Sequence, residues 1–192
     1  NASAEIKKTV KGYGKYILTI GRVYPIKNYE TVIKALVKIN PEVKYVIAGP
    51  ISSVEYKEKL DNLIKELHLE KRVIFAGIIR SFDKYYLIRK AQAMVHMAIW
   101  ESFCNVVHEG LSQGLPIIAA DNTALPLLVK NDFNGYCVGT YDQKAVAQKV
   151  NYIVKNMKTK KIQEMKIRNT KIGLEESWEN VSRKMKKFYE SK

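Results

Sequence analysis

Short apolar runs alternate with amphipathic segments along almost the whole chain, and this alternation restricts the fold more than any other feature. Runs rich in β-branched or small apolar residues predict strands at residues 15–23, 43–49, 72–77, 93–98, 115–120 and 135–138. Helical spacing predicts helices at residues 28–39, 52–69, 82–91, 105–113, 125–130, 143–155, 159–172 and 177–189. Strands that alternate with helices form a parallel sheet covered on both faces, so we expect an α/β, Rossmann-like sheet of about six strands.

The length of 192 residues suits one domain, or one domain with a small appendage. The opening Asn1-Ala2 resembles the scar of a cleaved tag, so residues 1–14 are expected to be a tag remnant and linker, and residues 15–192 the folded domain. No apolar run has the length of a membrane span, and no signal peptide is present. The two cysteines, Cys104 and Cys137, make no disulfide framework. These features predict a cytoplasmic protein in a reducing compartment.

The chain is strongly basic, with a formal net charge of +14. Such a charge favours an anionic partner. Part of the surplus lies in residues 155–192, which either dock on an anionic membrane surface or form an ordinary solvated helix face; we favour the solvated face. A nucleic-acid-binding domain is a further alternative, but the basic and aromatic residues form no recognised RNA- or DNA-binding motif, so we expect no nucleic acid.

Two cations follow the first predicted strand. Gly21 ends the strand, Arg22 comes next, and Lys27 precedes a helix for which Asn28 is the expected cap. Ligands of parallel α/β sheets bind at the carboxyl ends of the strands, where helix N-termini attract anions. Arginine offers a fork of donors and lysine a mobile point charge. The loop therefore predicts a phosphate-binding site, with solvated surface charges as the alternative.

Two carboxylates flank the loop after the fourth predicted strand. Glu101 lies in this loop, and Glu109 lies about one turn inside the helix that begins near Asn105. They are at least about 12 Å apart along the chain, which suits a molecule with hydroxyl groups at both ends and a diphosphate between. Backbone donors from Phe103 to Val106 would face the diphosphate. Two surface glutamates, or the paired acid and base of a glycosidase, are the alternatives.

Four stretches together resemble a known family. "ESFCNVVHEGLSQGLPIIA" resembles the E-x7-E signature of retaining glycosyltransferases of family 4, and "GRVYPIKN" resembles the glycine-arginine motif of that family's first strand. "LHLEKRVIFAG" and "SWENVSRKMKKFY" resemble two further family segments, in the same order. The resemblance runs from Tyr16 to Tyr189 and implies the C-terminal, nucleotide-sugar-binding half of a GT-B fold.

The resemblance also implies roles for single residues. Arg22 and Lys27 would hold the donor diphosphate, beside Gly21. Glu101 would contact the hydroxyls of the transferred sugar, and Glu109 would take the ribose diol. The backbone amides of the turn, which contains Phe103, Cys104 and Asn105, would face the sugar and the distal phosphate.

The activity implied by the resemblance is sugar transfer, with retention and without a metal or other cofactor, from a UDP-, GDP- or ADP-sugar to a hydroxyl acceptor such as a glycan or lipid-linked glycan. The family's N-terminal acceptor domain has no counterpart in this chain, so we expect the chain alone to bind donor weakly and to transfer nothing. A nucleotide-sugar epimerase of the same architecture is the nearest rival, and the E-x7-E spacing with Arg22 and Lys27 favours a transferase.

Some positions depart from the family pattern. Thr123 and Ala124 stand where the family has a glycine pair, which puts in doubt a close backbone approach to the donor there. Cys104 replaces a common glycine, and we expect an inert small side chain, although a thiol near a helix N-terminus can have a lowered pKa. His108 is interpreted as structural or exposed, and His96 as a packed core histidine.

Overall fold

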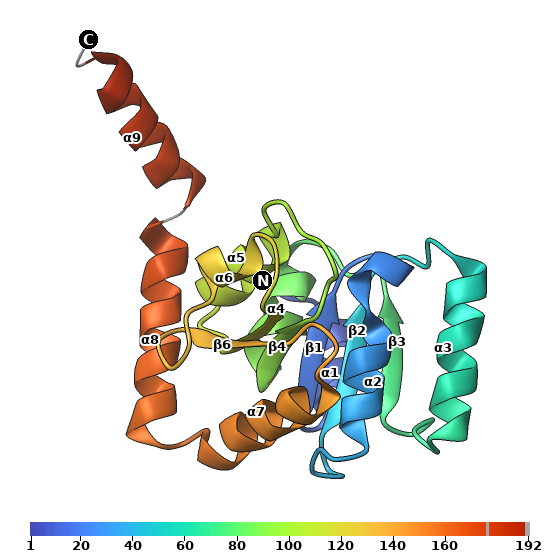
Figure 1. The fold of residues 1–192 in the computed structure, drawn as a ribbon. Helices are drawn as coiled ribbons and strands as arrows, with labels where there is room; N and C mark the ends of the chain where they lie inside the picture. The colour runs from blue at the N-terminus through green and yellow to red at the C-terminus, as the bar shows by residue number, and fades with distance from the viewer. Residues whose placement is uncertain (176, 191–192) are drawn as a thin grey trace.

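The protein, seen here in a computed structural model, is built on one six-stranded parallel sheet, and the structure describes residues 1–175 and 177–190. The sheet has the strand order β3-β2-β1-β4-β5-β6 (Figure 1). The strands are β1 (Tyr16–Ile20), β2 (Lys44–Ala48), β3 (Val73–Gly77), β4 (Ala93–His96), β5 (Ile117–Ala120) and β6 (Gly135–Val138). The predicted fold class, a Rossmann-like parallel sheet with helices around it, is confirmed.

Helices cover both faces of this sheet. They are α1 (Ala4–Tyr13), α2 (Tyr29–Leu36), α3 (Val54–Glu66), α4 (Ser81–Lys90), α5 (Asn105–Ser112), α6 (Leu125–Leu128), α7 (Gln143–Asn156), α8 (Lys160–Glu175) and α9 (Trp178–Glu190), and a 3₁₀ turn, η1 (Pro25–Lys27), precedes α2. Helix α2 packs against α3 and α7, whereas α4 packs against α1 and α5, and α5 against α8. Figure 1 shows α9 extending away from the sheet.

The strand order reverses at β1, and this reversal determines where the sheet can bind a ligand. The chain winds outward from β1 to β2 and β3, and then returns to β4 on the other side of β1. The loops after β1 and β4 therefore leave neighbouring strands in opposite directions and open a crevice at their carboxyl ends. The residues of β1 and β4 are almost fully buried, because apolar side chains fill both faces of the sheet.

Arg72 supports the opposite edge of the sheet. Its guanidinium donates hydrogen bonds to the carbonyl oxygens of Leu36, Ile39, Asn40 and Val43, at 2.9 to 3.2 Å. These carbonyls lie at and beyond the end of α2, where a helix leaves acceptors without intrahelical donors. The half-buried Arg72 side chain thus provides hydrogen bonds to the backbone carbonyls of the segment that leads into β2.

The first segment of the chain differs from the prediction. Residues 4–13 were predicted to be part of a tag remnant and linker, but they form helix α1. Ser3 caps the helix by accepting a hydrogen bond from the Ile6 amide, and Ile6 and Val10, one turn apart, are buried in the core. Ser3 also binds Asp83 of α4 through its amide and hydroxyl, at 2.7 and 2.8 Å. Most of this segment therefore belongs to the folded body.

Asn28 also differs from its predicted role. It stands at the N-cap position of α2, but its backbone is left-handed, with φ of 52°, and its side chain does not cap the helix. Instead, its amide nitrogen donates to the carbonyl oxygens of Met97 and Thr140, at 3.0 and 2.8 Å. Its amide oxygen accepts from the Thr31 hydroxyl at 2.8 Å. Asn28 thus ties together the loops that follow β1, β4 and β6.

No helix in residues 1–175 or 177–190 is both long enough and apolar enough to cross a membrane. Helix α8 lies close along α5, and no residue of α9 whose exposure is described is buried.

Candidate functional site

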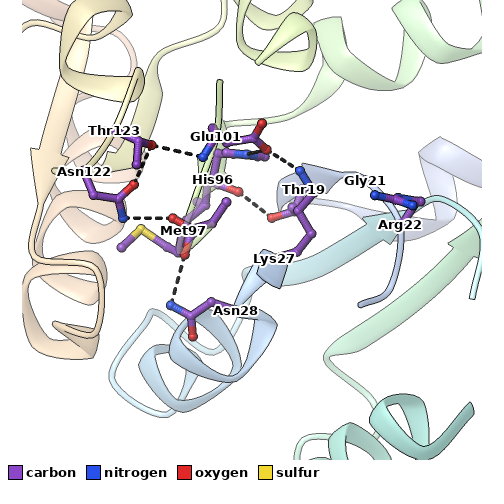
Figure 2. A network of polar contacts seen from close by, with 12 residues as sticks. Thr19, Gly21, Arg22, Lys27, Asn28, His96, Met97, Glu101, Asn122 and Thr123 are labelled. Atoms are coloured by element: carbon purple, nitrogen blue, oxygen red, sulfur yellow. Dashed lines mark hydrogen bonds and ion pairs between the residues drawn. The ribbon is translucent and has the colours of Figure 1, made fainter. Parts of the chain in front are cut away.

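Lys27 and Glu101 meet at the carboxyl ends of β1 and β4. Lys27 ends the turn η1, which starts at Pro25, and Glu101 lies in the loop between β4 and α5. The Lys27 ammonium donates a hydrogen bond to Oε1 of Glu101, and the two side chains are only 15% and 13% exposed. An ion pair so little exposed to water is screened less than a surface pair. The structure therefore brings together two of the residues that the sequence placed at this edge (Figure 2).

Two further residues hold Glu101, and the sequence analysis assigned neither of them to the site. His96, the last residue of β4, is 1% exposed, and its Nε2 lies 2.8 Å from Oε1 of Glu101. The Glu101 backbone amide donates to the Thr123 hydroxyl at 3.0 Å. His96 is buried, as predicted, but it contacts the site, and the one signal in the sequence was its place at the end of a strand that leads into Glu101.

The surroundings of Glu101 favour its ionised form. Burial by itself raises the pKa of Glu101, but hydrogen bonds from His96 and Lys27, with the positive charge of Lys27, outweigh burial and lower the pKa to about 2. The second carboxylate oxygen, Oε2, has no hydrogen-bond partner among the described residues. Glu101 thus presents one occupied oxygen and one oxygen that can accept from a ligand hydroxyl.

Arg22 lies apart from this pair. Its side chain is exposed, and its guanidinium carbon is 6.0 Å from the centroid of the Tyr24 ring. In the described part of the chain no hydrogen bond joins Arg22 to Lys27 or Glu101, and Figure 2 shows it to one side of them. A phosphate role for Arg22 stays a prediction that requires its side chain to turn toward a ligand.

Gly49 lets the backbone after β2 pass close to that of Gly21. A Cβ atom at Gly21 would make only ordinary van der Waals contact, 3.6 Å from the Lys27 side chain. At Gly49, which follows β2, a Cβ atom would lie 2.1 Å from the Gly21 carbonyl oxygen, and φ is 148°. The backbones after β1 and β2 therefore meet without side chains between them, and Lys27 runs past a bare backbone toward Glu101.

Glu109 lies on α5 and is paired with a residue that the sequence analysis did not name. Lys84 of α4 donates to Oε1 of Glu109 at 2.7 Å, and the two side chains are 24% and 26% exposed. Glu109 lines a cavity of about 730 Å³, together with Phe103 and Asn105. The Phe103 ring stacks on His108 with centroids 4.8 Å apart. The three predicted residues of this turn and helix thus share one hollow, which Arg22, Lys27 and Glu101 do not line.

Cys104 shapes the turn through its backbone. It stands at the N-cap position of α5 with φ of 59°, a left-handed conformation that explains why glycine is common there in the family. Burial, and then the nearby Glu101 carboxylate, raise the pKa of the Cys104 thiol to about 12, which fits an inert side chain. The Cys104 side chain does not cap α5, and the Val107 amide donates to the Cys104 carbonyl at 3.0 Å, so the amides of Asn105 and Val106 remain to donate to an anion.

The structure also gathers three groups of metal-ligand type, His96, Glu101 and Cys104, whose ligand atoms lie within 4.8 Å of one another. A metal ion would compete with the Lys27 ammonium for Oε1 of Glu101, and it would need the thiol to lose its proton. This donor set suits a cation poorly, and the absence of a metal from the reaction stays a prediction.

The parallel sheet, with charged side chains at the point where its strand order reverses, defines a doubly wound domain of Rossmann-like type. Residues 2–171 match the family model described as glycosyl transferases group 1. This match covers most of the chain, and the chain belongs to that family.

Curated relatives are longer than this chain. An uncharacterised glycosyltransferase of Methanocaldococcus jannaschii is 26% identical over 179 residues, which are 91% of this chain and 44% of the relative. The D-inositol 3-phosphate glycosyltransferase of Mycobacterium tuberculosis is 27% identical over 143 residues, which are 73% of this chain and 30% of that protein. The chain thus spans less than half the length of either relative.

Solved structures agree in fold. The Anabaena protein Alr3699/HepE in complex with UDP matches with a TM-score of 0.86 and 21% identity, over 100% of this chain and 54% of that one. Sucrose-phosphate synthase from Thermosynechococcus elongatus matches with a TM-score of 0.83 and 21% identity, over 99% of this chain and 49% of that one. At these identities the likeness shows the fold alone.

Proposed function

We propose that this chain is the donor-binding part of a retaining, metal-independent glycosyltransferase of family 4, and that it holds a nucleoside-diphosphate sugar at the crevice after β1 and β4. The ion pair between Lys27 and Glu101 carries this proposal. It places a cation for phosphate and a carboxylate for sugar hydroxyls side by side, at the edge where such sheets bind ligands.

Each end of the donor has a carboxylate in this proposal. Oε2 of Glu101 accepts from a hydroxyl of the transferred sugar, while Glu109 accepts from the ribose diol. Lys84 holds Oε1 of Glu109 and so leaves the other oxygen for the diol. The uncapped first turn of α5 lies between them and donates its N–H groups to the diphosphate.

The reaction would draw on the same charges. When the bond between the sugar and the diphosphate breaks, negative charge develops on the leaving phosphate. Lys27, the first turn of α5 and, after reorientation, Arg22 would stabilise this charge in place of a metal ion. Retention of configuration is carried over from the family resemblance, and so is the assignment of the transferred group as a hexose.

Among the UDP-, GDP- and ADP-sugars, we propose a UDP-sugar as the first donor to test. The support is that HepE, which shares the fold, is seen in complex with UDP and with UDP-glucose. The acceptor, a glycan or lipid-linked glycan, would be bound by a further domain that the longer relatives have room for. We therefore expect no transfer by this chain alone. The comparisons above support neither an epimerase nor a nucleic-acid-binding domain.

Calorimetric titration with UDP and with inorganic pyrophosphate tests the proposal. Lys27→Met is expected to weaken both ligands about tenfold, because the lost contact is to phosphate. Glu109→Ala is expected to weaken UDP by a similar factor and to leave pyrophosphate within about twofold, because only UDP has a ribose diol.

The control is Glu70→Ala, which removes an exposed glutamate before β3, at the opposite edge of the sheet. It should leave both ligands unchanged. Failure of the unaltered chain to bind UDP, GDP or ADP would refute the proposed function, and equal losses of UDP and pyrophosphate in Glu109→Ala would refute the role of Glu109.

A further inference from the structure

A buried histidine contacts the carboxylate at the centre of the proposed site. His96 Nε2 lies 2.8 Å from Oε1 of Glu101. None of the four stretches that resemble the family includes position 96. We propose that His96, neutral and protonated on Nε2, is a positioning residue that fixes the Glu101 carboxylate for the sugar. This inference rests on the proposed function and adds a residue to it.

The partners of the ring determine which nitrogen carries the proton. A carboxylate only accepts hydrogen bonds, so the contact with Oε1 of Glu101 requires a proton on Nε2. His96 Nδ1 is buried and has no hydrogen-bond partner among the described residues. A second proton on Nδ1 would be a buried donor without an acceptor, and it would charge a ring that shares the Glu101 carboxylate with the Lys27 ammonium. The neutral Nε2–H tautomer gives Oε1 of Glu101 its donor and leaves only the lone pair of Nδ1 without a partner among the described residues.

His96 is held rigidly, and Lys27 is not. His96 is the last residue of β4, and this strand pairs with β1 on one side and with β5 on the other, where His96 is in register with Ala119. The neighbouring Val95 carbonyl accepts a hydrogen bond from Thr19 of β1 at 2.5 Å. Lys27, in contrast, reaches Glu101 from a short turn through a flexible side chain.

Because of this difference, the two donors to Glu101 have separate roles when the nucleotide sugar binds. Lys27 must turn toward the diphosphate when the donor binds, since it is the cation of the pair. Glu101 is only 13% exposed, and without a second donor its buried oxygen would then lose its only partner. His96 stays in place and keeps Oε1 occupied, so Oε2 remains for a hydroxyl of the sugar.

The amides of two other amino acids provide matched variants. The side-chain amide nitrogen of glutamine can take about the position of histidine Nε2, whereas that of asparagine takes about the position of Nδ1. His96→Gln should therefore keep the hydrogen bond to Glu101, and His96→Asn and His96→Leu should lose it. Thermal unfolding and pyrophosphate binding show whether each variant is folded and retains the phosphate site.

The measured quantity is a ratio of two dissociation constants, that of the nucleoside diphosphate divided by that of the matching nucleoside-diphosphate sugar. The sugar is UDP-glucose, GDP-mannose or ADP-glucose, whichever the unaltered chain binds more tightly than the free diphosphate. His96→Leu and His96→Asn are expected to lower this ratio about tenfold, the equivalent of one hydrogen bond to a charged group. His96→Gln is expected to keep it within about twofold. The role of His96 would be overturned if the ratio in His96→Leu equals that of the unaltered chain. It would also be overturned if the ratio in His96→Gln is as low as that expected for His96→Leu.

A second measurement needs no ligand. Nitrogen-15 chemical shifts of the His96 ring near neutral pH should show a protonated Nε2 and an unprotonated Nδ1, and Glu101→Gln should change them while Glu70→Gln does not. A doubly protonated ring, or a proton on Nδ1, would overturn the inference even if nucleotides bind. Absence of nucleotide binding together with the expected shifts would instead refute the proposed function.

Discussion

Besides Asn28, two residues near the site have left-handed backbones although neither is glycine. Thr123 has φ of 48° and Cys104 has φ of 59°. Glycine is common at both positions in the resembling family, and this conformation supplies the physical reason, because glycine alone adopts it without a steric cost. A β-branched residue is least suited to it. At Thr123 the cost is offset locally, since the hydroxyl accepts from the Glu101 amide and donates to the Asn122 side chain at 2.9 Å.

Substitutions at Thr123 can separate the strain from the hydrogen bonds. Thr123→Val keeps the β-branched shape but loses both bonds, and we expect it to lower the free energy of unfolding by about 1 kcal/mol. Thr123→Gly loses the same bonds but relieves the backbone, and it should change the free energy of unfolding by less than about 0.5 kcal/mol. Urea unfolding measures both. A glycine variant less stable than the valine variant would show that the backbone at Thr123 is not strained.

The pKa of Glu101 predicts how its contribution to stability depends on pH. The pKa is lowered from its ordinary value of 4.5 to about 2 in the folded chain, so the contribution is complete above pH 4.5 and is lost as pH falls toward 2. We expect Glu101→Gln to cost about 1–2 kcal/mol near neutral pH, with a difference from the unaltered chain that shrinks over this range. Urea unfolding at a series of pH values checks this. A difference that stays constant down to pH 2 would contradict it.

At the scale of elements, glycines set the position of α5 on both of its sides. A Cβ atom at Gly110 would lie 2.9 Å from the Ile117 side chain of β5. A Cβ atom at Gly173 of α8 would lie 2.3 Å from the Cα atom of Ser112. Helix α5 therefore touches the sheet and α8 with almost no side-chain spacing. Because α5 carries Glu109 and starts at the turn of Cys104, these contacts fix the candidate site from behind.

Adding a methyl group to one of these contacts should separate the helices. Gly173→Ala is expected to lower the free energy of unfolding by about 1–3 kcal/mol, because its Cβ atom meets backbone atoms that cannot move alone. The matched control is Gly12→Ala in α1, where a Cβ atom would meet nothing within 4 Å. It should raise the free energy of unfolding by about 0.5–1 kcal/mol. Thermal unfolding of both variants gives the comparison, and stabilisation by both would refute the close packing of α8 on α5.

Helix α1 is an element that the sequence reading left out. It has ten residues, of which only Ile6 and Val10 are buried, and an isolated helix of this length is not stable in water. Contacts with α4 and the hydrogen bonds from Ser3 to Asp83 supply the remaining stability of the helix. Such long-range contacts leave no pattern in the local sequence. Residues 1–14 resemble a tag remnant and linker at their start, and so no helix was predicted there.

Shortening a buried side chain of α1 measures how much this helix contributes to the free energy of unfolding. Ile6→Ala is expected to lower the free energy of unfolding by about 2 kcal/mol, since a buried side chain is replaced by a cavity. Lys8→Ala, an exposed position on the same helix, is the control and should change it by less than about 0.5 kcal/mol. Equal effects in chemical denaturation would mean that α1 does not pack on the domain.

For the molecule as a whole, the fold was predictable and the side-chain partners were not. Every strand and helix expected from residue 15 onward is present, because apolar spacing reports burial directly. The approach of Lys27 to Glu101 followed from the rule that parallel strands end at one edge. Lys84 and His96 were missed as partners of the two glutamates, since 25 and 5 residues of sequence separation gave no indication of these contacts. The direction of Arg22 likewise depends on rotamers that no sequence pattern fixes.

The basic surplus is also a property of the whole chain. We interpret the cations of residues 155–192 as a solvated helix face, although α9 exposes Met185 and Tyr189 beside its lysines; residues 176, 191 and 192 lie outside the described residues. A cytoplasmic location, with or without docking to the membrane, stays a prediction. We expect the chain to sediment equally little with neutral vesicles and with vesicles containing anionic lipid. Enrichment of about tenfold on the anionic vesicles, lost on removal of residues 155–192, would instead assign a membrane surface as partner.

The single amide of Asn28 donates to carbonyls in two other loops and so has a practical consequence for redesign. The proposed donor site invites the grafting of one loop from a relative with a different substrate. Here a graft of the segment after β1 alone would leave the Met97 and Thr140 carbonyls without their shared donor, unless the incoming loop also carried an asparagine at this place. Engineering of substrate choice should therefore exchange the segments after β1, β4 and β6 as a set.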